Sequence, residues 1–394
     1  MGSGISIGTI SSLSKRTGGH PLSNSRKYDL SYVTVDSISE GVGSSQILPL
    51  MQRLANLGLS IQLISFEKTE PSQERQNAVR DTGISWNKRI FKTHGALGGL
   101  SRLIEISREI PNAKVIHARS DIPAVAAAFS RKAPILWDVR SLWADQKAFI
   151  EQDPIKRKIL KAYGLLEGIA SFNASAMSTL THAIVPVLEE RHRRVPQLRI
   201  VVPTAVDLAR FQLNSKIPVP IKGLYSGTYN NYYDLKLSKR FVDALREMAP
   251  VDVHWARPKE SPQNSLEAGE TKTFAATQIE MANILSEYSF GLSICKLDAG
   301  PSLKAAMPTK VAEFLACGRP MVVNAGLGDF DEYIREFDAG IILNGANEDL
   351  KLNAEKLIEL MNDPETPQRC RALAEKYFDI DKGAEKYFDL YTKI

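Results

Sequence analysis

Short apolar runs alternate with helix-like patterns along most of the chain. Residues 30–35 are rich in β-branched and apolar side chains, which predicts a buried strand. A polar, glycine-bearing loop at 36–45 follows, and apolar residues at helical spacing from Gln46 predict a helix that ends at Gly58. Residues 60–66 predict the next strand. A strand, glycine loop, helix and strand in this order indicate a doubly wound α/β domain, because parallel neighbours need a helical crossover.

The same alternation continues through the rest of the chain. Further strands are predicted at 115–116, 135–137, 183–187 and 200–202, and, beyond a proline-bearing linker at 215–220, at 223–225, 251–255, 273–274, 290–294, 321–324 and 340–343. The fold class expected is therefore α/β, with two facing Rossmann-like domains at 28–215 and 216–375 and a flexible extension at 1–27. Open parallel sheets bind ligands at the carboxyl ends of their strands, so two facing domains predict a cleft between them.

Composition narrows the class of protein further. The 394 residues are 43% hydrophobic and 24% charged, which excludes collagen-like and largely disordered chains. No apolar run approaches the ~20 residues needed to cross a bilayer. Three cysteines without CxxC spacing favour a reducing, cytoplasmic compartment over a disulfide framework or a zinc site. The net charge of +5 permits an acidic partner, but no nucleic-acid module is visible and no nucleic-acid partner is expected.

The densest group of candidate residues lies between positions 300 and 324. Pro308 and Thr309 open a predicted helix, with Thr309 as its N-cap. The free N–H groups of a helix start form a natural seat for phosphate. Glu313 lies about one turn further along, where it could accept hydrogen bonds from ribose or sugar hydroxyls. A capping-box glutamate that satisfies the helix start would stand at the same place, and the sequence leaves both interpretations open.

Several segments resemble one enzyme family. Residues 308–320 (PTKVAEFLACGRP) resemble the donor-nucleotide motif of retaining GT-B glycosyltransferases of the large bacterial family four, which builds lipopolysaccharide, capsule and exopolysaccharide. Residues 40–46 are similar to the N-terminal glycine loop of that family, and 202–207 with Phe211 are similar to its Pro-Asn-Gly-Val-Asp segment. Residues 225–228 stand where the family opens its C-terminal domain. In this order and spacing, the matches cover nearly the whole chain from residue 28.

The resemblance implies a fold and a reaction. The GT-B architecture is expected, with the last segment, 376–394, crossing back onto the first domain. The reaction implied is transfer of a sugar from a nucleotide-sugar donor to a glycan or lipid-linked glycan acceptor with retention of anomeric configuration, in cell-surface polysaccharide synthesis. The leaving phosphate takes the acceptor's proton, so no protein base is required and neither a metal nor another cofactor is expected. Cations and helix N-termini would stabilise charge on the diphosphate.

The resemblance also assigns donor-side residues. Lys310 is expected to take a catalytic role, and the expected donor-binding residues are Gly43, Gly227, Thr228, Arg257, Lys259, Lys304, Thr309 and Glu313. Two departures from the family pattern stand out. The first glutamate of its Glu-x7-Glu pair falls on Ala305, and the Arg and Lys that usually follow the first strand of the second domain are missing. Arg257 and Lys259 are either substitutes for them or solvated loop charges.

On the acceptor side, His117 and Arg140 are the candidates for a catalytic group near the transferred sugar. His117 has a second interpretation as a buried histidine bonded to a loop backbone. The expected acceptor-binding residues are Ser44, Arg119, Asp138 and Trp143. Trp143 could stack on a sugar ring or belong to the core.

Residues 154–171 predict a basic amphipathic helix, which is either a contact with anionic membrane or a solvated charged face. The expected location is therefore cytoplasmic and peripheral on the inner face of the cell membrane. Two other function classes stay open. One is a catalytically silent subunit that binds a nucleotide or sugar, and the other is a nucleotide-sugar epimerase.

Overall fold

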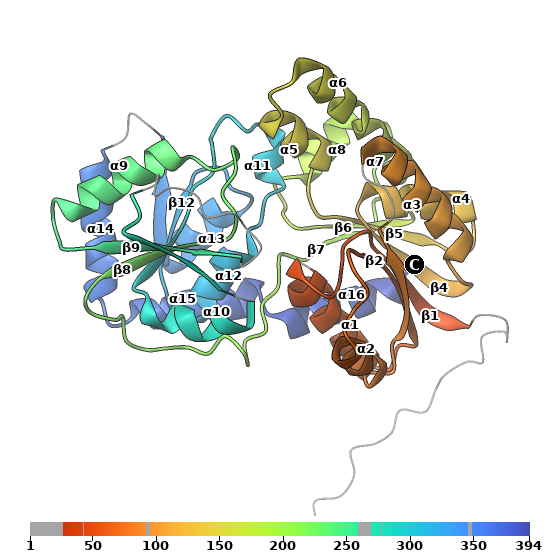
Figure 1. The fold of residues 1–394 in the computed structure, drawn as a ribbon, viewed down its shortest axis with the longest axis horizontal. Helices are drawn as coiled ribbons and strands as arrows, with labels where there is room; N and C mark the ends of the chain where they lie inside the picture. The colour runs from red at the N-terminus through yellow and green to blue at the C-terminus, as the bar shows by residue number, and fades with distance from the viewer. Residues whose placement is uncertain (1–26, 42, 92–94, 259–268, 277, 346–348) are drawn as a thin grey trace, which may run out of the picture.

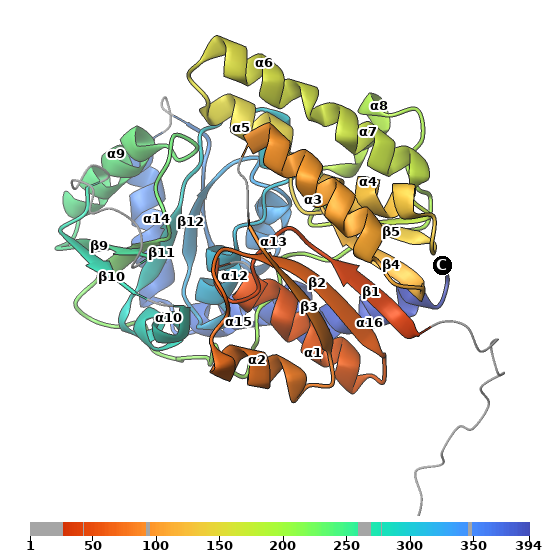
Figure 2. The ribbon, with the colours of Figure 1, turned by 45° about the vertical axis from the view of Figure 1, so that its right-hand side comes forward.

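Two α/β domains lie side by side in the computed structural model, which describes residues 27–394 except 42, 92–94, 259–268, 277 and 346–348 (Figures 1 and 2). Each domain is built on one open parallel sheet with helices on both faces. The predicted fold class of two Rossmann-like domains is therefore confirmed. Among the described residues, none of the helices is both long and apolar enough to cross a membrane.

The N-terminal sheet has the strand order β3-β2-β1-β4-β5-β6-β7, with every neighbouring pair parallel. Its strands are β1 (Tyr28–Val33), β2 (Ile61–Glu67), β3 (Ser85–Ile90), β4 (Ala113–Arg119), β5 (Ile135–Val139), β6 (Ala176–Thr179) and β7 (Arg199–Val201). Its helices are η1 (Gly43–Ile47), α1 (Leu48–Asn56), α2 (Gln73–Arg80), α3 (Gly95–Glu109), α4 (Asp121–Ser130), α5 (Trp143–Ile150), α6 (Pro154–Ala162), α7 (Gly164–Asn173) and α8 (Val185–Arg191). Both faces of the sheet are buried, which explains the continuous apolar runs of its central strands.

The C-terminal sheet has the order β10-β9-β8-β11-β12-β13 and is also wholly parallel. Its strands are β8 (Lys222–Ser226), β9 (Asp252–Arg257), β10 (Lys272–Ala275), β11 (Phe290–Ser293), β12 (Met321–Asn324) and β13 (Gly340–Leu343). Its helices are α9 (Leu235–Arg246), α10 (Gln278–Ile284), η2 (Leu285–Glu287), α11 (Pro301–Lys304), α12 (Thr309–Ala316), α13 (Phe330–Phe337), α14 (Leu350–Asn362) and α15 (Thr366–Tyr377).

The last helix, α16 (Ile380–Tyr391), lies against the N-terminal domain beside α1 (Figure 1). Tyr387 and Leu390 are buried in the same apolar cluster as Leu30 and Leu63 of the N-terminal sheet. The chain therefore passes between the domains twice, at the β7–β8 linker and at α16.

Two predicted elements are corrected by the structure. Residues 183–187 do not form a strand, because Pro186 stands in the first turn of α8, where its fixed φ suits a helix and its missing N–H is not needed. The strand at this place in the sheet is β6, whose four residues, Ala-Met-Ser-Thr, offer no long apolar run. The segment 154–171 is two helices, α6 and α7, which meet at Tyr163.

Hydrogen bonds between the domains set the position of α11 and α12. The Thr181 hydroxyl donates to the Lys304 carbonyl at 2.5 Å, and the Thr204 hydroxyl donates to the Met307 carbonyl at 2.5 Å. At the start of α13, the Asp329 carboxylate accepts from the backbone N–H groups of residues 182 and 183 at 2.6 and 3.0 Å. These bonds hold the segment 304–309 against the carboxyl end of the N-terminal sheet.

Candidate functional site

Helix α12 begins between the two domains, and its first turn carries the donor-side candidates. Pro308 is the N-cap and Thr309 the first helical residue, so the prediction that Thr309 caps the helix is wrong. The cap makes no side-chain hydrogen bond. Pro308 has no N–H for a glutamate to accept from, and Glu313 stands five positions after it, so the capping-box interpretation of Glu313 does not hold. In the first turn the Val311 N–H donates to the Pro308 carbonyl at 3.1 Å.

Lys310 is held over the loop that follows β8. Its Nζ donates to the Tyr233 hydroxyl at 2.9 Å and lies 4.5 Å from the centre of that ring. Gly227 has φ +105°, and a Cβ there would stand 3.4 Å from Lys310 Nζ. The structure thus brings Lys310 and Gly227 together, with the exposed Thr228 next in the chain. A glycine here leaves room for the ammonium group and lets a ligand approach the backbone.

Glu313 lines a small pocket between the domains. Its other residues are Ser45, Gln46 and Pro49 from the N-terminal glycine loop and α1, and Ala205, Val206, Asp207, Arg210 and Phe211 from the segment after β7. The Gln46 amide fixes this arrangement, because it donates to the Ala205 carbonyl at 2.8 Å and accepts from its N–H at 3.0 Å. Three segments that the sequence singled out therefore meet at one pocket.

Burial raises the pKa of Glu313 to about 7, although Arg210 and Lys310 act to lower it. The half-buried carboxyl therefore binds a proton readily near neutral pH. Ligand hydroxyls would replace water as hydrogen-bond donors to the Glu313 carboxylate and would stabilise its ionised form.

The pH dependence of stability should report this carboxyl. The folded protein holds the Glu313 proton up to about pH 7, whereas the unfolded chain releases it near its ordinary value of 4.5. The resulting stability is complete below pH 4.5 and lost as pH rises through 7. Glu313→Gln stays neutral, so we expect its melting temperature to exceed that of the wild type by about 1–3 °C at pH 8 and to match it at pH 5.

Differential scanning fluorimetry at several pH values measures this difference. Glu355→Gln, an exposed glutamate on α14, is the matched control and should follow the wild type. Parallel profiles for Glu313→Gln and the wild type would contradict the raised pKa.

The glycine loop after β1 is shaped by Gly43 and by a glutamate that the sequence analysis missed. A Cβ on Gly43 would lie 1.8 Å from the Ser37 carbonyl oxygen, so only glycine fits. The buried Glu67, at the end of β2, accepts from the Ser37 hydroxyl at 2.5 Å and from the Ile38 N–H at 3.0 Å. Ser44 donates its hydroxyl to the Gly41 carbonyl at 3.2 Å. A carboxylate ending an apolar strand was the available signal for Glu67.

His117 is not a cleft residue. β4 extends to Arg119, so His117 lies inside the strand rather than after it, and it is completely buried. Its Nδ1 is 2.6 Å from the Tyr391 hydroxyl and its Nε2 is 3.3 Å from Asp138. Burial lowers the pKa of His117 despite the nearby carboxylate, which favours the neutral ring. The expected catalytic role of His117 is therefore corrected to a structural one under α16.

Asp138 is buried in the same way and is the centre of a charged cluster. It accepts from the Ser178 hydroxyl at 2.9 Å and the Tyr387 hydroxyl at 3.2 Å. Arg119 and Arg140 place guanidinium nitrogens 3.6 and 3.5 Å away. Burial alone would raise the pKa of Asp138, but Arg140, His117 and Arg119 hold it well below its usual value. The expected contact of Asp138 with an acceptor is corrected accordingly, because its oxygens face protein groups.

Arg119 joins this cluster to the loop after β1. It is 5% exposed, and its Nε donates to Asp36 at 3.0 Å. The geometry also does not support binding of the sugar acceptor by Arg119, since its guanidinium group already pairs with Asp36 and Asp138. Arg140, half-buried at the end of β5, and Trp143, 41% exposed at the start of α5, are the more accessible acceptor candidates. Its exposure does not fit the core interpretation of Trp143, whose ring stands edge-on to Tyr163 at 5.7 Å.

The remaining donor candidates stand at or after the ends of α11 and β9, and Arg257 stands next to Ala256, whose carbonyl accepts from the Gly227 N–H at 2.9 Å. Lys304 is the exposed last residue of α11, and Ala305 beside it is buried against the N-terminal domain. Arg257 ends β9, where its Nη1 donates to the Pro258 carbonyl at 3.3 Å. Lys259 lies outside the described residues.

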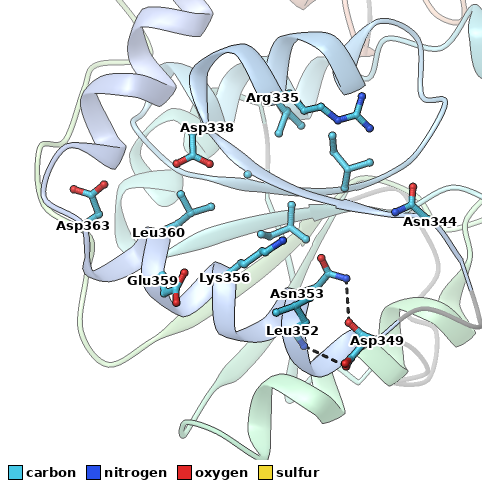
Figure 3. A pocket seen from close by; sticks show the side chains of 14 residues that line it. Arg335, Asp338, Asn344, Asp349, Leu352, Asn353, Lys356, Glu359, Leu360 and Asp363 are labelled. Atoms are coloured by element: carbon cyan, nitrogen blue, oxygen red, sulfur yellow. Dashed lines mark hydrogen bonds between the residues drawn. The ribbon is translucent and has the colours of Figure 1, made fainter.

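A second pocket, of about 750 Å³, lies on the far edge of the C-terminal domain between α13, β13 and α14 (Figure 3). Several of its carboxylates already serve the fold. Asp349 caps α14, while Asp338 and Asp363 are bridged by Arg369. None of the residues predicted from the sequence to bind donor or acceptor lines this pocket.

Comparison with solved structures identifies the architecture. Sucrose-phosphate synthase from Thermosynechococcus elongatus superposes with a TM-score of 0.65 at 13% identity, covering 92% of this chain and 98% of that one. HepE from Anabaena in complex with UDP-glucose gives 0.64 at 11% identity, covering 93% and 100%. WaaG, a glycosyltransferase involved in lipopolysaccharide biosynthesis, gives 0.61 at 13% identity, covering 92% and 99%. The chain has the GT-B fold.

No family model matches the sequence, and no curated protein matches it either. The likeness is therefore one of fold along nearly the full length of the chain. In this GT-B fold the Glu313 pocket lies between the two domains, on residues of both.

Proposed function

We propose that this protein is a glycosyltransferase that moves a sugar from a nucleotide-sugar donor to an acceptor hydroxyl. The observation that carries the proposal is the pocket in which Glu313 of α12 faces the glycine loop of the other domain. Its supporting context is a two-domain fold similar to WaaG and to HepE, a protein solved with UDP-glucose. A carboxylate of raised pKa suits vicinal hydroxyls of a ribose or sugar.

The donor diphosphate would lie at the start of α12. The positive end of the helix dipole and the Lys310 ammonium would stabilise the charge that builds on the leaving phosphate. We take transfer to proceed with retention, the leaving phosphate itself accepting the acceptor's proton. Burial of His117 is compatible with a reaction that needs no protein base. Independence of metal and of other cofactors is part of the proposal.

The acceptor proposed is a glycan or a lipid-linked glycan of cell-surface polysaccharide synthesis. Arg140 and Trp143 at the carboxyl end of the N-terminal sheet, and Ser44 in the glycine loop, are the residues to contact it. A site for a lipid-linked glycan suits a cytoplasmic protein that lies at the inner face of the membrane. The segment 154–171 would make the contact with that membrane.

A thermal-shift panel with UDP, GDP, ADP, TDP and CMP tests the donor site. A nucleotide present at 100 times its dissociation constant stabilises the folded state by ~2.7 kcal/mol. We expect one of these nucleotides to stabilise the wild type. The same nucleotide should stabilise Glu313→Ala much less, and it should stabilise the exposed control Glu355→Ala as much as the wild type. If none of the five nucleotides stabilises the wild type, the proposed donor site is overturned.

Ala305 favours a second candidate, a catalytically silent subunit that binds nucleotide. This residue stands where the resembling family has its first glutamate, and it carries no polar atom. Release of nucleoside diphosphate from a nucleotide-sugar that contains the stabilising nucleotide distinguishes the two, since a silent subunit would bind without turnover.

A further inference from the structure

In the described part of the chain, the two sheets end in four edge strands, and one of these differs from the others. β3, β7 and β10 each carry lysine or arginine, at Lys88, Arg89, Arg199 and Lys272. β13 consists of one glycine, two isoleucines and one leucine. Charged side chains on an edge strand hinder its pairing with a further strand. β13 lacks this protection.

The backbone of β13 is paired along one side. The carbonyls of Ala339 and Leu343 accept from N–H groups of β12 and of the residue that follows β12, at 3.3 and 2.9 Å. Backbone groups of successive residues point to opposite edges of a strand, so those of Gly340 and Ile342 point away from β12. No described strand pairs with β13 on that side. The N–H and C=O groups of these two residues are therefore available to another chain.

This free edge runs along the pocket of about 750 Å³ on the C-terminal domain (Figure 3). α13 belongs to the apolar cluster on one face of the sheet and α14 to the cluster on the other face, so one helix stands on each side of β13. Both helices contribute apolar side chains to the lining, namely Ile334 on α13 and Leu352 and Leu360 on α14. A further strand would lie about 4.8 Å from β13. The pocket is thus a groove that accommodates one extended chain.

Two cations in the lining of this groove are poorly neutralised. Lys356 forms no ion pair with another described residue, and Figure 3 shows its side chain turned toward the middle of the groove. The Arg335 side chain is 65% exposed, and its contact with Asp331 is long, at 3.8 Å. Three of the carboxylates in the lining already cap α14 or pair with Arg369, and Glu359 is turned away from β13 in Figure 3. A chain in the groove therefore meets uncompensated positive charge.

We infer that β13 pairs with an extended segment of a partner protein, in which acidic side chains stand among β-branched ones. Backbone hydrogen bonds with Gly340 and Ile342 add the segment to the sheet as a further strand. Side chains of the segment alternate between the two helices. Acidic ones meet Arg335 on α13 and Lys356 on α14, while β-branched ones cover Leu352, which is 48% exposed.

A second copy of this chain is a poorer partner for the same edge. Its β13 is also flanked by α13 and α14, so the helices of two copies would meet before their edge strands do. An extended segment brings no such helices with it. The groove shares no residue with the Glu313 pocket, so the inference is independent of the proposed function.

Selection on the full chain from a random library of phage-displayed dodecapeptides tests the inference. We expect the enriched peptides to be rich in Asp, Glu, Val, Ile and Thr, and their binding to weaken as salt rises. A fluorescein-labelled copy of one enriched peptide gives a dissociation constant by fluorescence polarisation. Hydrogen exchange should slow at residues 340–343 when this peptide is bound, because the N–H groups of Gly340 and Ile342 gain acceptors.

A proline at position 342 separates pairing from stability of the sheet. Ile342→Pro removes an N–H that points away from β12, so the hydrogen bonds to β12 remain. We expect this change to weaken peptide binding at least about tenfold. Ile342→Val keeps the N–H and should bind as the wild type does.

Charge reversal on α14 tests the acidic character of the partner without altering the strand. Lys356→Glu changes an exposed side chain and should weaken peptide binding about tenfold. Its matched control is Lys236→Glu on α9, an exposed lysine outside the groove, which should bind as the wild type does. Circular dichroism and the nucleotide thermal shift, measured on every variant, keep loss of folding or of the donor site apart from loss of peptide binding.

Three results would overturn the inference. They are a library from which no peptide is enriched, an enriched peptide that binds Ile342→Pro and Lys356→Glu as tightly as the wild type, and slowed exchange that lies away from residues 340–343. A dimer seen by light scattering that Ile342→Pro abolishes would assign the edge to self-pairing instead.

Discussion

Replacing Lys310 by methionine is expected to lower the turnover number about 10²–10³-fold while leaving the melting temperature nearly unchanged. Methionine keeps the apolar stem over the Tyr233 ring but removes the ammonium that lies beside Gly227 at the start of α12. Charge developing on a diphosphate there would lose the stabilisation by this cation. The measurement is release of nucleoside diphosphate from a nucleotide-sugar that contains the nucleotide found to stabilise the wild type. Where no glycan is supplied, water is the acceptor and the sugar is hydrolysed.

Two variants show whether the ammonium acts directly. Tyr233→Phe removes the hydroxyl that accepts from Lys310 at 2.9 Å, so it should cost less than Lys310→Met and act through position alone. Lys236→Met, an exposed lysine on α9, should retain full turnover. Turnover of Lys310→Met within twofold of the wild type would refute the assignment of this residue to the donor diphosphate.

Replacing Asp138 by alanine is expected to destabilise the N-terminal domain by about 3–5 kcal/mol. The carboxylate is 1% exposed and lies between the guanidinium groups of Arg119 and Arg140. Its removal leaves two cations close together without their shared counter-charge, and removes the acceptor of the Tyr387 hydroxyl from α16. Asp138→Asn keeps the shape and one acceptor, so its loss should be smaller.

Urea unfolding followed by circular dichroism measures this loss. The matched control is Asp145→Ala. Asp145 accepts hydrogen bonds from both Nη atoms of Arg191 but is 31% exposed, so its replacement should destabilise the protein by about 1 kcal/mol or less. Equal losses for the two variants would show that burial of the Asp138 cluster adds nothing. The low pKa of Asp138 also predicts that its contribution, present above its ordinary value of 3.8, is lost as pH falls.

The two predictions separate chemistry from architecture at the carboxyl ends of the two sheets. Lys310 belongs to the C-terminal domain and is half-buried beside a loop that a ligand could reach. Asp138 belongs to the N-terminal domain and is enclosed by its own sheet and α16. A charged residue near a strand end is therefore a candidate for ligand binding only where the protein leaves part of it uncovered.

Local pattern was sufficient for most of the architecture. Strands β12 and β13 have the bounds predicted for them, because each is a short apolar run between a helix and a polar loop. The helix that carries Glu313 was also predicted. The loop predicted at 36–45 is shorter in the structure, because η1 already begins at Gly43. Edge strand β3 was missed, since its sequence, SWNKRI, contains no apolar run and only one of its long edges is paired.

The sequence by itself determined the two-domain α/β plan and the chemical groups on each loop, because periodicity and residue type are local properties of the chain. Only the tertiary structure decided which of those groups a ligand could reach. His117 lies under α16, where its ring contacts Tyr391, a residue 274 positions further along the chain. Glu313 meets the glycine loop for the same reason, since packing joins segments that no local pattern relates.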